Sequence, residues 1–177
     1  MTAPASGAKS GEETETAIAW FRRDLRVNDN PALVAACRSD AVVPVFCFEA
    51  VLHSGRHASA NRNAFLLESL RELDEALRAA GSRLHVRSGD PAVQIARLAR
   101  EAGAAKVHVN RDHTVHSRNR DRRLQEALAE DGIELCGHTG ISCAEIAAIE
   151  AGSGGPYKVF TPFYKAWARS GLSLIHI

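Results

Sequence analysis

The chain alternates between two sequence patterns, and this alternation restricts the folds that it can adopt. Short apolar runs with strand character alternate with longer stretches in which apolar residues recur at helical spacing. Between residues 60 and 80, leucines and a phenylalanine recur at three- and four-residue intervals, which indicates a helix that packs one face on a sheet. The expected strands are residues 17–21, 41–48, 83–87, 106–110 and 133–136, and the expected helices are residues 31–38, 60–80, 91–102 and 117–131.

A strand, a helix and a further strand in repeated succession produce right-handed crossovers and a parallel sheet. Gly81, Gly103 and Gly132 stand directly after three of the expected helices, where glycine is the usual residue at a helix C-terminus. At 177 residues the chain has the length of one domain. We therefore predict a single α/β domain over residues 17–150, built on a five-stranded, parallel, doubly wound sheet of Rossmann-like type.

The two ends of the chain lack this pattern. Residues 1–16 are mostly small or polar and show no apolar periodicity, so we expect a disordered leader there. The glycine-rich stretch from Gly152 to Pro156 has the composition of a flexible connector. We therefore interpret residues 151–177 as the start of an interdomain linker that is truncated.

Composition limits the partners and the cellular location. Lys and Arg number 22 against 21 for Asp and Glu, so the net charge of +1 provides no general basic field for nucleic acid. The four cysteines show no Cys-x-x-Cys spacing and there is no signal peptide, which favours a reduced, cytoplasmic location. No apolar stretch approaches the roughly 20 residues that span a membrane, so no membrane partner is expected.

The turn after the first expected strand has an unusual composition. It reads Trp20-Phe21-Arg22-Arg23-Asp24-Leu25-Arg26 and continues into Asn28-Asp29-Asn30-Pro31-Ala32-Leu33. Asn30 suits an N-cap and Pro31 the first helical position, so a helix is expected to begin there. Ligands of open α/β sheets bind at the C-terminal ends of strands, which makes this charged turn a candidate functional edge. The alternative is an ion-pair cluster that only fixes the turn.

This segment closely resembles the opening signature of the DNA photolyase/cryptochrome family. A second match lies near the end of the chain, where the stretch from Val159 to Trp167 resembles the Val-Phe-Thr-Pro-Phe-x-x-x-Trp of the family. The resemblance implies that the chain is the N-terminal α/β domain, which binds an antenna chromophore and harvests light. Full-length members carry FAD in a further, helical domain and use it with blue light to repair cyclobutane pyrimidine dimers in DNA.

That helical FAD domain is absent from the sequence, so the resemblance implies a non-catalytic fragment. Its partners would be its own missing FAD-binding domain and, through the parent protein only, UV-damaged DNA. The alternatives are a fragment of a cryptochrome-type blue-light signalling protein and a nucleotide-binding, stress-protein-like α/β module. A nucleotide-binding module would need a glycine-rich phosphate loop after a strand, and a dehydrogenase would need Gly-x-Gly-x-x-Gly; the sequence contains neither at that place.

The resemblance places the antenna in a cleft at the strand ends, for which the cofactor-binding candidates are Phe46, Phe48, Arg62, Asp112 and His116. The aromatic rings would stack on the pigment, although both could equally be sheet core. Deazaflavin-binding members carry an arginine and an aspartate in slots that Arg62 and Asp112 match. Folate-binding members carry Asn-Glu where His116 and Ser117 stand, so a deazaflavin is favoured over methenyltetrahydrofolate.

Two further patterns in the expected helix 117–131 and the loop before it have competing interpretations. His113 and His116 have the separation of two zinc ligands, but no nearby cysteine or acid pair completes a site, so we expect no metal. Four arginines crowd the start of the helix and oppose its dipole, which suggests either a nearby phosphate or a solvated face. They are Arg118, Arg120, Arg122 and Arg123.

Overall fold

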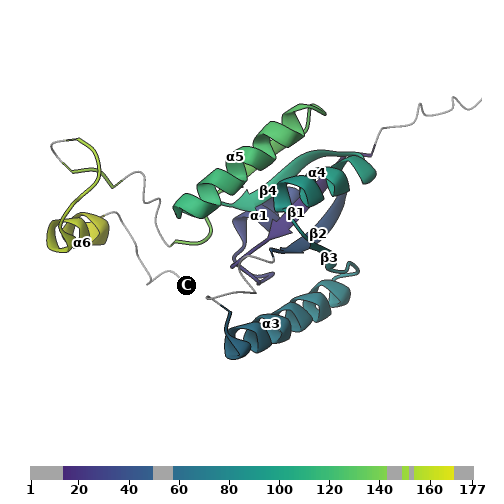
Figure 1. Ribbon diagram of the computed structural model, residues 1–177, viewed down its shortest axis with the longest axis horizontal. Helices are drawn as coiled ribbons and strands as arrows, with labels where there is room; N and C mark the ends of the chain where they lie inside the picture. The colour runs from purple at the N-terminus through teal and green to yellow at the C-terminus, as the bar shows by residue number, and fades with distance from the viewer. Residues whose placement is uncertain (1–13, 50–57, 143–148, 152–153, 170–177) are drawn as a thin grey trace, which may run out of the picture.

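The computed structural model describes residues 14–49, 58–142, 149–151 and 154–169. In this part of the chain, five parallel strands form one sheet with helices on both of its faces (Figure 1). The strands are β1 (Thr16–Phe21), β2 (Ala41–Phe48), β3 (His85–Ser88), β4 (Ala104–Asn110) and β5 (Glu134–His138). The helices are α1 (Pro31–Ala36), α3 (Ala60–Ala79), α4 (Pro91–Glu101), α5 (Val115–Ala129) and α6 (Phe160–Arg169). The predicted fold class is confirmed.

The strand order is β3-β2-β1-β4-β5. The strands β2 and β3 therefore follow one another on one side of β1, and β4 and β5 follow one another on its other side. The direction of building reverses between β1 and β4, and doubly wound sheets bind their ligands beyond the strand C-termini at such a reversal. The charged turn that begins at Arg22 directly follows β1 and therefore lies at this reversal.

The hydrophobic core consists of two layers, one on each face of the sheet. Ile18 and Trp20 pack with α4 and α5, whereas Ala17, Ala19 and Phe21 pack with α1 and α3. Because both faces of β1 are covered, its sequence is continuously apolar instead of alternating between apolar and polar residues.

Side-chain caps set where four of the helices begin. Asn30 caps α1 by accepting a hydrogen bond from the Leu33 N–H, as the sequence predicts. Ser59 and Asp90 cap α3 and α4 in the same way. Thr114 accepts from the Ser117 N–H, so α5 begins at Val115, two residues before its expected start. The local cap at Thr114 decides this boundary, because the apolar periodicity of the helix only becomes visible later.

The long helix α3 packs on the sheet along only part of its length. Leu70, Leu73 and Leu77 are buried, but Phe65 is 72% exposed. The expectation that Phe65 belongs to the packed stripe is therefore wrong. In Figure 1 the helix lies on the opposite side of the sheet from α4 and α5. Its N-terminal half borders a cleft instead of packing on the sheet.

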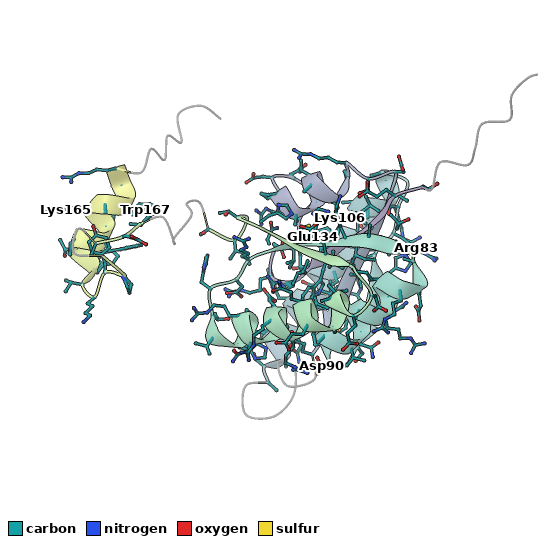
Figure 2. The ribbon with its side chains drawn as sticks, turned by 90° about the horizontal axis from the view of Figure 1, so that it is seen from above. Arg83, Asp90, Lys106, Glu134, Lys165 and Trp167 are labelled. Carbon is teal, nitrogen blue, oxygen red and sulfur yellow. The ribbon has the colours of Figure 1, made fainter. Side chains whose placement is uncertain are left out.

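The C-terminal segment forms a short amphipathic helix of its own. None of the residues of α6 is buried, and Figure 1 and Figure 2 both show this helix apart from the sheet. Its aromatic rings stack on one another, with centroids of Phe160 and Tyr164 5.9 Å apart and those of Tyr164 and Trp167 also 5.9 Å apart. Of the predicted disordered leader, residues 1–13 lie outside the described part of the chain. No helix among the described residues is long and apolar enough to cross a membrane.

Candidate functional site

A cleft of about 800 Å³ lies between the N-terminal half of α3, the C-terminal ends of β1 and β2, and the first turns of α5. We call it the α3–α5 cleft. Its volume is in the range of small-molecule sites, which run from about 300 to about 1,000 Å³. Apolar surface on its walls comes from Trp20, Leu25, Phe46, Phe65 and Leu66. The exposure of Phe65 is thereby explained, because its side chain forms part of the cleft wall instead of the core.

Four of the five sequence-predicted binding residues line this cleft. They are Phe46, Arg62, Asp112 and His116, which come from β2, α3, the loop after β4 and α5. The fifth, Phe48, is absent from the lining and instead packs edge-on against Phe46, with ring centroids 4.9 Å apart. Phe46 is buried, so its ring belongs both to the sheet core and to the cleft wall. Whether these side chains hold a ligand stays a prediction.

Asp112 is fixed in place as a carboxylate. One of its oxygens accepts a hydrogen bond from the Thr114 N–H at 3.1 Å, and the other pairs with the Arg23 guanidinium at 3.3 Å. Burial alone would raise the pKa of Asp112, but the hydrogen bonds from Thr114 and Ser117 and the charge of Arg23 outweigh it and lower the pKa. At neutral pH the Asp112 carboxylate is therefore a negatively charged hydrogen-bond acceptor in the cleft, next to the N-terminus of α5.

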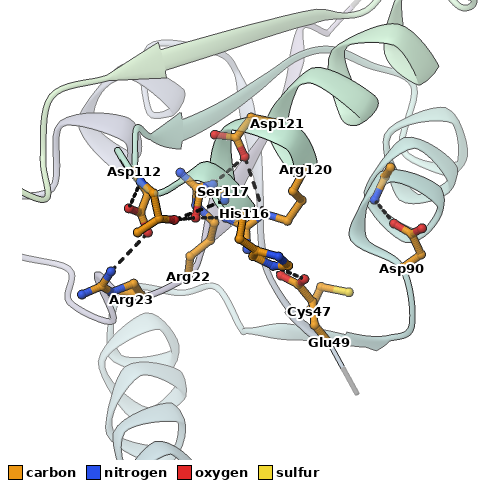
Figure 3. Close-up of polar contacts among 12 residues, drawn as sticks. Arg22, Arg23, Cys47, Glu49, Asp90, Asp112, His116, Ser117, Arg120 and Asp121 are labelled. Carbon is orange, nitrogen blue, oxygen red and sulfur yellow. Dashed lines mark hydrogen bonds and ion pairs between the residues drawn. The ribbon is translucent and has the colours of Figure 1, made fainter. Parts of the chain in front are cut away.

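The opposite side of the cleft holds a buried ion-pair cluster, which Figure 3 shows. Glu49 pairs with the Arg120 guanidinium at 2.5 Å and with His116 Nε2 at 3.1 Å. Arg22 pairs with Asp121 at 2.6 Å. The Arg22 and Arg120 guanidiniums each lie 5.0 Å from the centroid of the Trp20 ring, within cation–π range.

The lining is therefore nearly balanced in charge. Arg22, Arg23 and Arg120 each have a carboxylate partner. Burial, reinforced by the charge of Glu49, raises the pKa of the Cys47 thiol to about 11, so this side chain stays neutral and unreactive. The arrangement suits holding a planar, largely apolar molecule by stacking and a few hydrogen bonds, more than it suits nucleophilic or acid–base catalysis.

Sequence reasoning assigned no binding role to Glu49, Arg120 or Trp20, all of which line the cleft. For Glu49 a signal was present, since an acidic residue directly after a buried strand lies at the edge where ligands bind. For Arg120 there was none, because nothing in the run of α5 arginines distinguishes the one that is buried.

The charged turn after β1 is held by a buried hydrogen-bond network. Asp24 accepts from the Arg22 N–H at 2.9 Å and from the Asn110 side-chain amide at 2.5 Å. The same Asn110 amide donates to Asn30 at 2.8 Å, and its oxygen accepts from the Ala32 N–H at 3.2 Å. Asn110 thus ties the end of β4 to the turn after β1. The turn fixes the edge of the cleft, and Arg22 additionally lines it.

The described residues contain no group of three or more His, Cys, Asp and Glu side chains placed to hold a metal ion. His116 bonds to Glu49. His113 instead lines a different groove, on the other side of α5.

Comparison with known proteins agrees with the sequence resemblance. A profile of the DNA photolyase family matches residues 17–175. The deoxyribodipyrimidine photo-lyase of Streptomyces griseus is 38% identical over 159 residues, which cover 88% of this chain and 35% of that protein.

Solved structures give the same result. A class III photolyase from Agrobacterium tumefaciens superposes with a TM-score of 0.81 at 34% identity, covering 93% of this chain and 34% of that one. A photolyase from Sulfolobus tokodaii superposes with a TM-score of 0.72 at 32% identity, covering 85% and 34%. Cryptochromes also appear among the matches. The chain spans about a third of the length of the photolyases it matches. On the family profile, the fold and these relatives together, the chain belongs to the DNA photolyase family.

Proposed function

We propose that this chain is the light-harvesting domain of a deoxyribodipyrimidine photo-lyase and that it holds an antenna chromophore of the deazaflavin or flavin type in the α3–α5 cleft. The observation that carries the proposal is the cleft itself. It opens beyond the C-termini of β1 and β2, is walled by aromatic and aliphatic side chains, and brings Arg62 and Asp112 to one cavity.

The residues present fit a tricyclic pigment. Such a ring system needs an apolar slot with a small number of polar groups that fix its orientation. Phe46 and Leu66 supply apolar surface, while Asp112 and Ser117 supply hydrogen-bonding groups. When bound, the pigment would absorb light and pass the excitation on. The related Sulfolobus tokodaii protein is described as holding two FAD molecules, with the implication of a novel light-harvesting cofactor, which supports a flavin-type pigment as a candidate.

The proposal extends to the activity of a full-length protein, and the photolyases among the relatives support it. A full-length protein would repair cyclobutane pyrimidine dimers in DNA with FAD held by a further domain, and this chain alone would not catalyse repair. Its partners would then be that FAD-binding domain and, through it, UV-damaged DNA, in the cytoplasm.

Reconstitution tests the pigment site. The purified chain would be titrated with an 8-hydroxy-5-deazaflavin, riboflavin and methenyltetrahydrofolate, with fluorescence anisotropy as the measure of binding. We expect the deazaflavin to bind more tightly than the folate, and Asp112→Ala to weaken it about tenfold through loss of a charged hydrogen-bonding partner. Asp131→Ala is the matched control, because Asp131 pairs with Arg100 away from the cleft. Equal affinity of both variants, or preference for the folate, would contradict the proposal.

A cryptochrome-type signalling protein is the second candidate, because cryptochromes are among the relatives of this chain. The α/β domain is common to both classes. Light-dependent repair of a dimer-containing oligonucleotide by the full-length protein separates them, since a signalling protein would bind the pigments without repairing the DNA.

A further inference from the structure

The four arginines near the start of α5 fall into two groups. Arg120 is buried and pairs with Glu49, and Arg123 pairs with Asp90 at the N-terminus of α4. Arg118 and Arg122 have no carboxylate partner among the described residues, and both are exposed. They stand one helical turn apart, so they project from the same side of α5.

These two arginines line a groove of about 390 Å³ between α5 and the C-terminal ends of β4 and β5. A third, Arg111, directly follows β4 and lies along β5, where a Cβ at Gly137 would be 2.5 Å from its Nε. Glycine at position 137 therefore leaves the space that the Arg111 side chain occupies. We call this the arginine groove; its floor includes Val109 and Leu135.

Two carboxylates, Asp112 and Asp121, also line the arginine groove, and each is paired with an arginine of the α3–α5 cleft. Asp121 pairs with Arg22 and Asp112 pairs with Arg23, as Figure 3 shows. Arg111, Arg118 and Arg122 outnumber these two carboxylates in the lining, and the structure shows no ion pair for any of the three arginines among the residues that it describes.

We propose that the arginine groove binds phosphate groups of a phosphorylated ligand. Three like charges around one groove repel one another, Arg118 in the first turn of α5 also opposes the helix dipole, and a bound anion reduces both costs. The planar guanidinium matches the oxygen spacing of a phosphate and can bind it through two parallel hydrogen bonds. The apolar floor excludes water from one side of the groove, which strengthens attraction to an anion. This site is separate from the pigment cleft and does not depend on it.

Two double variants of the full chain test the proposal. Arg118→Gln/Arg122→Gln removes two charges from the groove. Arg97→Gln/Arg100→Gln removes two charges from α4, where both arginines are exposed and pair with Glu101 and Asp131. The two variants therefore have the same net charge but lose it at different places, and the α4 variant also breaks two exposed ion pairs. The probes are pyrophosphate and ATP, followed by calorimetry, and a labelled single-stranded oligonucleotide of about 12 bases, followed by anisotropy.

We expect the groove variant to weaken binding about tenfold and the α4 variant to change it less than about twofold, because only the first removes contacts with phosphate. The probes distinguish the source of the phosphate. If ATP and pyrophosphate bind and the oligonucleotide does not, the ligand is a small phosphorylated molecule. Tighter binding of the oligonucleotide would indicate a nucleic acid strand, and the groove variant would then lower the slope of log affinity against log salt by about 1.4.

Two results would overturn the proposal. One is that the unmodified chain binds none of the three probes at millimolar concentration in low salt. The other is that both double variants weaken binding equally, which would show a response to net charge and not to the groove. Circular dichroism and a urea titration of each variant exclude loss of folding as the cause, and the single variant Arg111→Gln repeats the test from β4 instead of α5.

Discussion

The ion pair between Glu49 and Arg120 offers the sharpest test of how the cleft is held together. Both side chains are 9% exposed and their charged atoms lie 2.5 Å apart. Glu49 also bonds to His116, but the His116 side chain is 51% exposed. One carboxylate therefore has a buried partner at 2.5 Å and a half-exposed partner at 3.1 Å. Substituting each partner separately compares a buried ion pair with a half-exposed contact on the same carboxylate.

The structure sets the expected magnitudes. Removing one member of a fully buried pair costs about 3–5 kcal/mol, because the other charge is left without a partner. In Glu49→Gln the amide oxygen can still accept one hydrogen bond, and Asp121 stays 3.5 Å from Arg120 Nε. We therefore expect the free energy of unfolding to fall by about 2–3 kcal/mol. His116→Ala should lower it by no more than about 1 kcal/mol, since water screens the exposed ring.

Urea unfolding of four proteins measures the pair directly. They are the unmodified chain, Glu49→Gln, Arg120→Gln and the double variant, with unfolding followed by circular dichroism. Arg120 also covers the Trp20 ring, and the double-mutant cycle cancels this packing contribution. The double variant should lose less stability than the sum of the single variants, by at least about 1 kcal/mol. A coupling energy below about 0.5 kcal/mol, which is within the error of additivity, would refute the view that this pair is a buried, strongly interacting one.

Four further predictions concern other parts of the molecule. Gly140→Ala should destabilise the fold by more than about 2 kcal/mol in a thermal melt, because its Cβ would meet the buried Asn110 side chain, whereas Gly137→Ala should cost under about 1 kcal/mol, because the flexible end of an exposed arginine can move away. Burial lowers the pKa of both His108 and His138 below the ordinary value of about 6.5. As the pH falls from about 7.5 to about 5.5, the unfolded chain therefore binds more protons than the folded chain, and the urea midpoint should decrease. The decrease should be smaller in His138→Gln, which lacks one of the two histidines. Riboflavin should bind the cleft at least as tightly as flavin mononucleotide in a fluorescence titration, because three cleft arginines already have carboxylate partners; a large preference for the phosphate form would contradict that charge balance. Phe160 is 74% exposed on α6, so Phe160→Ser should reduce any concentration-dependent self-association seen in sedimentation, and an unchanged sedimentation profile would show that this face is not the contact.

Much of the fold could be read from the sequence because its signals are local. The period of the apolar residues distinguishes strands from helices, and Asn30 with Pro31 marks the start of α1 through a cap that spans only a few residues. The strand–helix alternation then restricts the sheet to parallel pairing. Helix boundaries were predicted less accurately. The start of α5 is set by the Thr114 cap, which lies N-terminal to the part of the helix where apolar residues recur at helical spacing.

The candidate site could be predicted in part. Phe46 and Asp112 stand at or just after strand C-termini, and in a parallel sheet those ends meet at one edge, so their convergence follows from topology. The resemblance to the family added Arg62 and His116. The same reasoning placed Phe48 in the cleft, but its ring packs edge-on against Phe46 and is not part of the lining. Phe46 and Phe48 are two residues apart and therefore point to the same face of the sheet, so the alternation along the strand could not distinguish the one that lines the cleft.

The sequence by itself therefore determined the class of fold, the edge of the sheet where ligands bind, and the family. Only the tertiary structure decided which charges are paired. Nothing in the order of Arg118, Arg120, Arg122 and Arg123 reveals that the second lies buried against Glu49, 71 residues away in the chain. Pairing of charges depends on distances between elements that are remote in sequence, and those distances exist only once α5 has packed across the end of β2. The same packing leaves Arg118 and Arg122, on the opposite side of α5, without a carboxylate partner among the described residues.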